Sequence, residues 1–107
     1  MIEAEKLRQK ATTLQNEEIG FAEMAASLVE SNPTGMLVVK ILLGNEIREF
    51  LDLNWEIHEQ ISELLAGRTL QEIPDIDCLQ RIVSLQQKLV ELASENVNAI
   101  LQVLNQD

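Results

Sequence analysis

The chain is poor in aromatic residues, with no tyrosine, one tryptophan and two phenylalanines among its 107 residues. Leucine, isoleucine and valine must therefore fill any core. The scarcity of aromatic residues favours packed helices over a β-sandwich or barrel, in which aromatic residues are abundant. Apolar residues still make up 46% of the chain, which excludes a disordered tail. A chain of this length is expected to form one domain, residues 1–107, with its own core.

Cysteine is also scarce, because Cys78 is the only one. A disulfide within the chain is impossible, and a reducing compartment is favoured. The first 20 residues lack the apolar region of a signal peptide. No run approaches the roughly 18 apolar residues of a membrane span. We therefore expect a cytoplasmic protein that does not bind membranes.

Basic residues are few: eight lysines and arginines stand against 18 acids, which gives a formal net charge of −10. A surface of this sign repels phosphates, so nucleic acid is excluded as a partner and an anionic membrane is disfavoured. The acids are spread along the chain instead of being gathered. This dispersal favours an ordinary solvated surface, and an acidic nucleic-acid mimic that inhibits a basic protein is kept as an alternative.

Apolar residues recur at alternating three- and four-residue steps in three long stretches, which is the spacing of one helical face. The pattern predicts helices at about 2–31, 36–66 and 77–105. Short connections make consecutive helices antiparallel neighbours. The predicted fold is all-α, an elongated antiparallel three-helix bundle that self-associates.

Capping residues mark the second connection. Gly67 is well placed just after the second helix, where glycine commonly closes a helix. Thr69 and Glu72 have the spacing of a capping box. Asp75 or Asp77 is expected to cap the third helix.

The segment 36–43 is apolar around nearly its whole circumference, interrupted only by Lys40. Its length also suits a buried strand, but a lone strand has no partner elsewhere in the chain, so we expect a helix. A helix that packs in a single three-helix bundle does not need apolar residues around so much of its circumference. The surplus predicts a second layer, either a homodimer or a partner protein, unless this segment lies centrally beneath both other helices.

The candidate partner-binding residues therefore lie on the second helix. Most belong to the apolar run, and a tryptophan lies further along, towards the polar side. A partly exposed tryptophan is a common interface anchor, although the third helix could instead cover it. The predicted contact residues are Met36, Leu37, Val38, Ile41 and Trp55.

Glu18 occupies a position in the apolar stripe of the first helix. With Pro33 as the centre of the turn, Glu18 and Glu46 fall nearly level, and two nearby carboxylates can hold a divalent cation. The simpler expectation, which we prefer, is that Glu18 reaches the edge of the bundle and stays solvated.

The only histidine and the only cysteine have few partners for chemistry. His58 has neither a second histidine for a metal site nor a catalytic triad, and we expect it to pack at the helix boundary and bond a neighbour. Cys78 lies in the first turn of the third helix, where Asp75 and Asp77 oppose a thiolate. We expect a small, half-buried helix residue. The sequence thus predicts no catalytic residue and no cofactor.

Four acids form an alternative site. Glu17-Glu18 followed by Glu49-Phe-Leu-Asp52 resembles the EExxE…ExxD arrangement of the all-α nucleotide pyrophosphohydrolases (MazG-like), over most of the first two predicted helices. Phe21 stands where that family has its third glutamate. The resemblance implies that Glu17, Glu18, Glu49 and Asp52 bind magnesium and that the protein hydrolyses a nucleoside triphosphate.

The preferred hypothesis is a protein-interaction module, either a small adaptor or an export- or assembly-type chaperone, that offers an apolar surface to a partner helix. The chain is similar in its general look to small acidic helical secretion and flagellar chaperones, which is an analogy and not a shared motif. The expected partner is another protein or a second copy of the chain.

Overall fold

The structure, a computed structural model, describes residues 2–105 and contains three long α-helices. They are α1 (Ile2–Ser31), α2 (Pro33–Leu65) and α3 (Ile76–Leu104), and a short 3₁₀ turn, η1 (Leu70–Glu72), precedes α3. The predicted helices are confirmed, and each boundary lies within about three residues of the prediction. The described residues contain no strand, so the apolar run in the first turns of α2 is helical, as expected.

The capping residues between α2 and α3 are mostly those that the sequence indicates. Gly67 follows α2 with φ 78°, a left-handed conformation that glycine tolerates because it has no Cβ. Thr69 and Glu72 form the capping box, with a hydrogen bond of 2.9 Å from Thr69 N to Glu72 Oε1. Hydrogen bonds from the Thr69 backbone and hydroxyl lower the pKa of the Glu72 carboxyl, because they favour its charged form. Asp75, and not Asp77, caps α3.

Arg8 of α1 fixes this connection to the bundle. Its guanidinium donates hydrogen bonds of 3.1 Å to the Leu70 carbonyl and 2.7 Å to the Ile73 carbonyl. The side chain of Ile73 is completely buried. The connection is therefore packed against α1 and contributes to the core.

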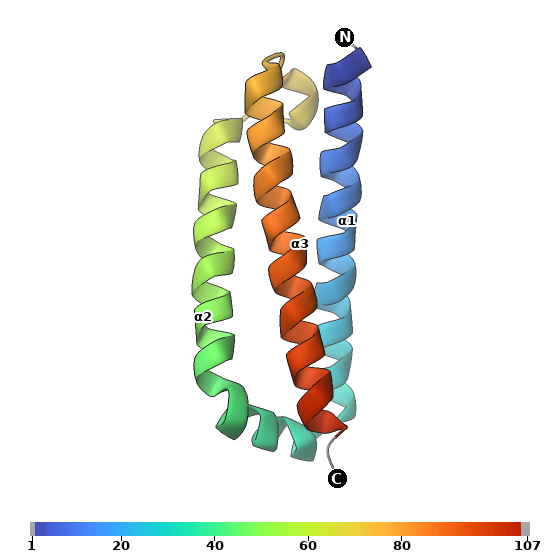
Figure 1. The fold of residues 1–107 in the computed structure, drawn as a ribbon, viewed down its shortest axis with the longest axis vertical. Helices are drawn as coiled ribbons and strands as arrows, with labels where there is room; N and C mark the ends of the chain where they lie inside the picture. The colour runs from blue at the N-terminus through green and yellow to red at the C-terminus, as the bar shows by residue number, and fades with distance from the viewer. Residues whose placement is uncertain (1, 106–107) are drawn as a thin grey trace.

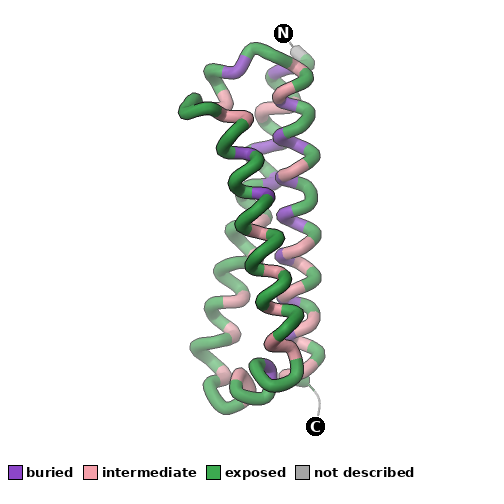
Figure 2. Tube along the Cα trace, turned by 90° about the vertical axis from the view of Figure 1, so that its left-hand side faces the viewer, coloured by how far each residue is buried: buried purple, intermediate pink, exposed green. Residues whose placement is uncertain are grey.

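α3 lies between the other two helices and is the centre of the fold (Figure 1). It packs along both α1 and α2, which touch each other at few points. α1 and α3 run in the same direction and α2 runs the opposite way, so consecutive helices are antiparallel, as predicted (Figure 1). Buried residues recur along the inner side of the helices while the outer side is exposed (Figure 2). Leu79, Leu89 and Val97 of α3 are among the most completely buried side chains.

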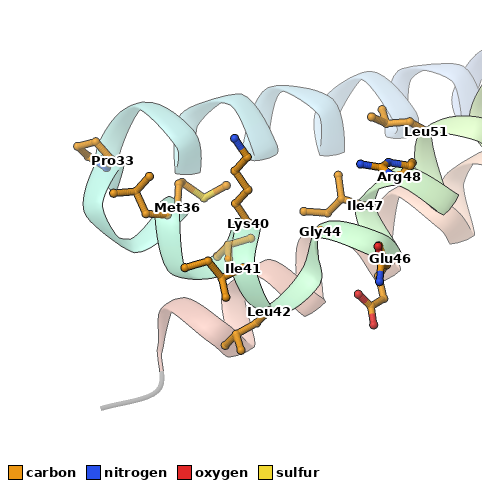
Figure 3. Close-up of a pocket in the computed structure, with 13 residues that line it drawn as sticks. Pro33, Met36, Lys40, Ile41, Leu42, Gly44, Glu46, Ile47, Arg48 and Leu51 are labelled. Atoms are coloured by element: carbon orange, nitrogen blue, oxygen red, sulfur yellow. The ribbon is translucent and has the colours of Figure 1, made fainter.

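α2 is bent near Gly44 (Figures 1 and 3). Its first turns, residues 33–43, cross the end of the bundle, and residues 45–65 then run beside α3. We call these two parts the transverse segment and the ascending arm. Glycine is a common site of helix bending, because it lacks a Cβ and weakens the local helix.

Two exposed or half-buried helix glycines provide a matched test of packing. Gly20, which could have divided α1 in two, lies within a continuous helix and has no atom within 4 Å of an added Cβ. We expect Gly20→Ala to raise the free energy of unfolding by about 0.5–1 kcal/mol, because alanine loses less conformational entropy. At Gly35 a Cβ would lie 2.5 Å from Leu104 Cδ2, so that side chain must move.

The measurement is urea unfolding of both variants followed by circular dichroism. We expect Gly35→Ala to be at least about 1 kcal/mol less stable than Gly20→Ala, because it crowds the contact between α2 and α3. Equal gains from the two substitutions would contradict the packing of the transverse segment against the end of α3.

Candidate interaction surface

The transverse segment presents large apolar side chains to solvent. Ile41 is 81% exposed and Leu37 is 63% exposed, and Val38 is exposed as well. Met36 is half-buried, and Val39 is completely buried on the inner side. One face thus holds the segment to the bundle while its other apolar faces stay open. The alternative that this segment lies centrally beneath both other helices is wrong.

The bend of α2 borders an open concavity of about 780 Å³. Met36 and Lys40 line it from the transverse segment, and Ile47 and Leu51 line it from the ascending arm (Figure 3). Every lining residue belongs to α2, so neither of the other helices closes it. An open hollow of this size, lined by both apolar and polar side chains, suits the side chains of another helix better than a small molecule, which needs an enclosing pocket.

Charged side chains of both signs border this concavity. Lys40 and Arg48 project to one side of the bend and Glu46 projects to the other (Figure 3). All three are exposed, and none of them forms an ion pair within residues 2–105. Their charges are therefore free to pair with groups on another molecule.

Trp55 extends the exposed apolar surface along the ascending arm. It is 68% exposed, so α3 does not cover it. Leu51, which is also exposed, lies one helical turn before Trp55. His58, one turn after it, bonds α1 through Glu18. The exposed surface thus runs from the concavity along the side of α2 that faces α1.

A polar contact joins all three helices above the concavity. Glu18 Oε1 accepts a 2.7 Å hydrogen bond from Gln86 Nε2, and Glu18 Oε2 lies 2.8 Å from His58 Nε2. Gln86 is buried, while the side chain of Glu18 is 15% exposed and that of His58 is 46% exposed. His58 bonds a neighbour, as expected, but the prediction of a solvated Glu18 is wrong.

The predicted level pair of Glu18 and Glu46 is also wrong. Glu18 contacts His58, which lies twelve residues beyond Glu46 on α2 (46 to 58), or about 18 Å along a helix. The prediction assumed that α2 runs alongside α1 directly after Pro33. The transverse segment instead crosses the end of the bundle, and this crossing shifts the register of α2 against α1.

The four acids of the pyrophosphohydrolase resemblance do not form a cluster. Among residues 2–105 no group of three or more histidine, cysteine, aspartate or glutamate side chains is placed to hold a metal ion. Glu18 is bonded to His58 and Gln86, and Glu49 borders a groove between α2 and α3. Glu17 and Asp52 are exposed. The geometry therefore offers no support for magnesium-dependent hydrolysis.

Cys78 is half-buried in the first turn of α3, as expected. Its thiol donates to the Leu64 carbonyl near the end of α2, with a distance of 3.6 Å from Sγ to O. This contact joins the start of α3 to the end of α2. It gives the cysteine a packing role.

Sequence reasoning missed two features of this site. Gln86 interrupts the apolar face of α3, and that single polar residue was a readable sign of a buried partner. Gly44 marks the bend, but glycine within a helix does not specify the direction of a bend. The concavity and its charged border therefore appear only in three dimensions.

No protein-family model, no curated protein and no solved structure matches this chain. No helix in the described part of the chain is both long enough and apolar enough to cross a membrane.

Proposed function

We propose that this protein is a small interaction module, an adaptor or an assembly- or export-type chaperone, that binds another protein chain through the apolar surface of the α2 bend. The observation that carries the proposal is the exposure of Leu37, Ile41 and Trp55 on one helix. Exposed apolar side chains that gather on one surface mark sites of protein binding more often than scattered ones do.

Burial of these side chains supplies the driving force. Covering a leucine, isoleucine or similar side chain completely contributes about 1.5–3 kcal/mol. Leu37 and Ile41 lie one helical turn apart, which is the spacing that lets two residues enter one groove of a partner helix. Trp55 adds a large anchor further along the same helix.

Contacts with α1 and α3 keep the exposed surface of α2 ordered in the absence of a partner. Val39 and the contact between Gly35 and Leu104 fix the transverse segment to the bundle, and the contact of Glu18 with His58 holds the ascending arm to α1. A surface that is already ordered loses little conformational entropy when a partner binds. This favours a binding role in which the folded module stays the same.

Site-specific photo-crosslinking in the native host tests the proposal. A photoreactive residue in place of Ile41 is expected to give a defined crosslinked protein species, because that side chain projects from the apolar surface. The matched control is the same residue in place of Asn98, which is exposed on α3. Crosslinking at both positions alike, or at neither, would remove the α2 surface as the binding site.

A further inference from the structure

The exposed surface area of the chain is larger than a molecule of its size needs. A compact monomer of this mass exposes about 6,000 Å². This chain exposes 7296 Å² and measures 53 × 21 × 17 Å. The excess, roughly 1,300 Å², comes from the elongated shape of the molecule, and a standard interface buries approximately 800 Å² of each partner. The elongated molecule therefore has room for an interface of standard size.

The surface of the α2 bend has features that match a second copy of itself. Leu37 and Ile41 themselves line the concavity, and their side chains are largely exposed, so projecting side chains and a hollow belong to one patch. A two-fold axis brings the same patch of two molecules together. Such a patch must be self-complementary, with both a projection and a hollow that can receive it. A projection beside a hollow meets that condition.

The charges at the bend meet the same condition. Lys40 and Glu46 carry opposite charges, border the same concavity and have no ion-pair partner in the described residues. Across a two-fold axis, Lys40 of one molecule can face Glu46 of the other, and the reverse pair forms by symmetry. A wholly basic border would instead favour an acidic foreign partner, given that the rest of the chain is acidic.

We propose that two copies of this chain associate through their α2 bends, with Leu37 and Ile41 of each copy seated in the concavity of the other and Lys40 paired with Glu46 across the two-fold axis. This inference rests on the proposed function, because it names the occupant of the same surface. It also explains why the transverse segment keeps its outer apolar faces open when one face suffices to attach it to the bundle.

Sedimentation equilibrium of the purified full chain, from about 1 to 200 µM, tests this inference. We expect wild type to dimerise in that range. Ile41→Glu is expected to weaken association at least about tenfold, because it places an unpaired charge in an apolar contact. Ile41 is largely exposed in the single chain, so circular dichroism should show an unchanged fold. Asn98→Glu on α3 is the matched control and should leave the dimer intact.

A charge exchange tests the pairing. Lys40→Glu and Glu46→Lys are each expected to weaken the dimer about threefold to tenfold, and the double variant should return to within about twofold of wild type. Repulsion between two acidic chains predicts a different result, because Glu46→Lys would then strengthen association while Lys40→Glu weakens it. That opposite pattern would overturn the proposed pairing.

The outcomes separate this inference from the proposed function. A chain that stays monomeric to about 200 µM overturns the second-copy inference. If a photoreactive residue at position 41 still gives a specific crosslink to a different protein, the proposed function is supported, and that protein is the partner that binds the α2 surface. If the chain is monomeric and Ile41 gives no crosslink, both proposals fall. A dimer that Ile41→Glu leaves unchanged places the interface elsewhere and also overturns this inference.

Discussion

Leu89→Ala is expected to lower the free energy of unfolding by about 2–5 kcal/mol, the largest effect of any single substitution considered for this chain. Leu89 is completely buried in the core cluster and belongs to α3. Alanine there loses the transfer free energy of the leucine side chain and leaves a cavity that the helices can fill only in part. The total free energy of unfolding of a small domain is about 5–15 kcal/mol, so this loss is a large share of it.

The position of α3 makes this cavity costly for the whole fold. α1 and α2 touch each other at few points, so each depends on α3 for its core contacts. A cavity on α3 therefore weakens both neighbours together, and we expect a single cooperative transition at lower temperature. The expected fall in Tm is roughly 8 °C or more.

Thermal and urea unfolding followed by circular dichroism measure this effect. The matched control is Leu53→Ala, the same chemical change at a position on α2 that is 45% exposed. Its cost should be less than about half that of Leu89→Ala, because less apolar surface is lost and less of a cavity forms. Equal costs at the two positions would contradict the central place of α3.

Glu18→Ala is expected to destabilise the fold by about 1–3 kcal/mol, the second largest effect. Glu18 accepts the hydrogen bond of the Gln86 amide, and Gln86 is the buried polar side chain of the described core. Removal of the acceptor leaves that amide without its protein partner, and an unsatisfied buried donor bears its full desolvation cost. His58→Ala should cost less than about 1 kcal/mol, because its ring is half-exposed and water can replace it.

A double-mutant cycle checks that reason. If the buried amide causes the loss, Gln86→Leu in the Glu18→Ala background should recover part of the stability, because no polar group then remains to be satisfied. Glu18→Gln should be milder than Glu18→Ala, since its amide oxygen can still accept from Gln86. Urea unfolding at neutral pH measures four variants, which are Glu18→Ala, Gln86→Leu, the double variant of these two and Glu18→Gln. No recovery in the double variant would show that Gln86 finds another partner and that this contact does not hold α1 to α3.

Most of the fold could be predicted from residue patterns. The spacing of apolar residues gave the three helices, since one face of each must be buried. The capping box of Thr69 and Glu72 is local hydrogen bonding, so it too was readable. The exposed apolar surface of α2 was partly readable, because residues 36–43 have more apolar perimeter than one attachment to a bundle requires. The hydrogen-bond partners of Glu18 could not be predicted, because they depend on the alignment of helices that lie far apart in sequence.

The sequence by itself determined that this protein is helical, acidic and without a recognisable catalytic constellation. Those properties follow from composition and from periodicity within single helices, and each depends on neighbours a few residues apart. Only the tertiary structure decided that α3 is the central helix, that α2 bends near Gly44 and that His58 meets Glu18. A shift of a few turns leaves the apolar stripe of a helix buried, so the stripe does not fix the register between helices. The bend sets that register, and with it the shape and charge of the surface we propose for binding.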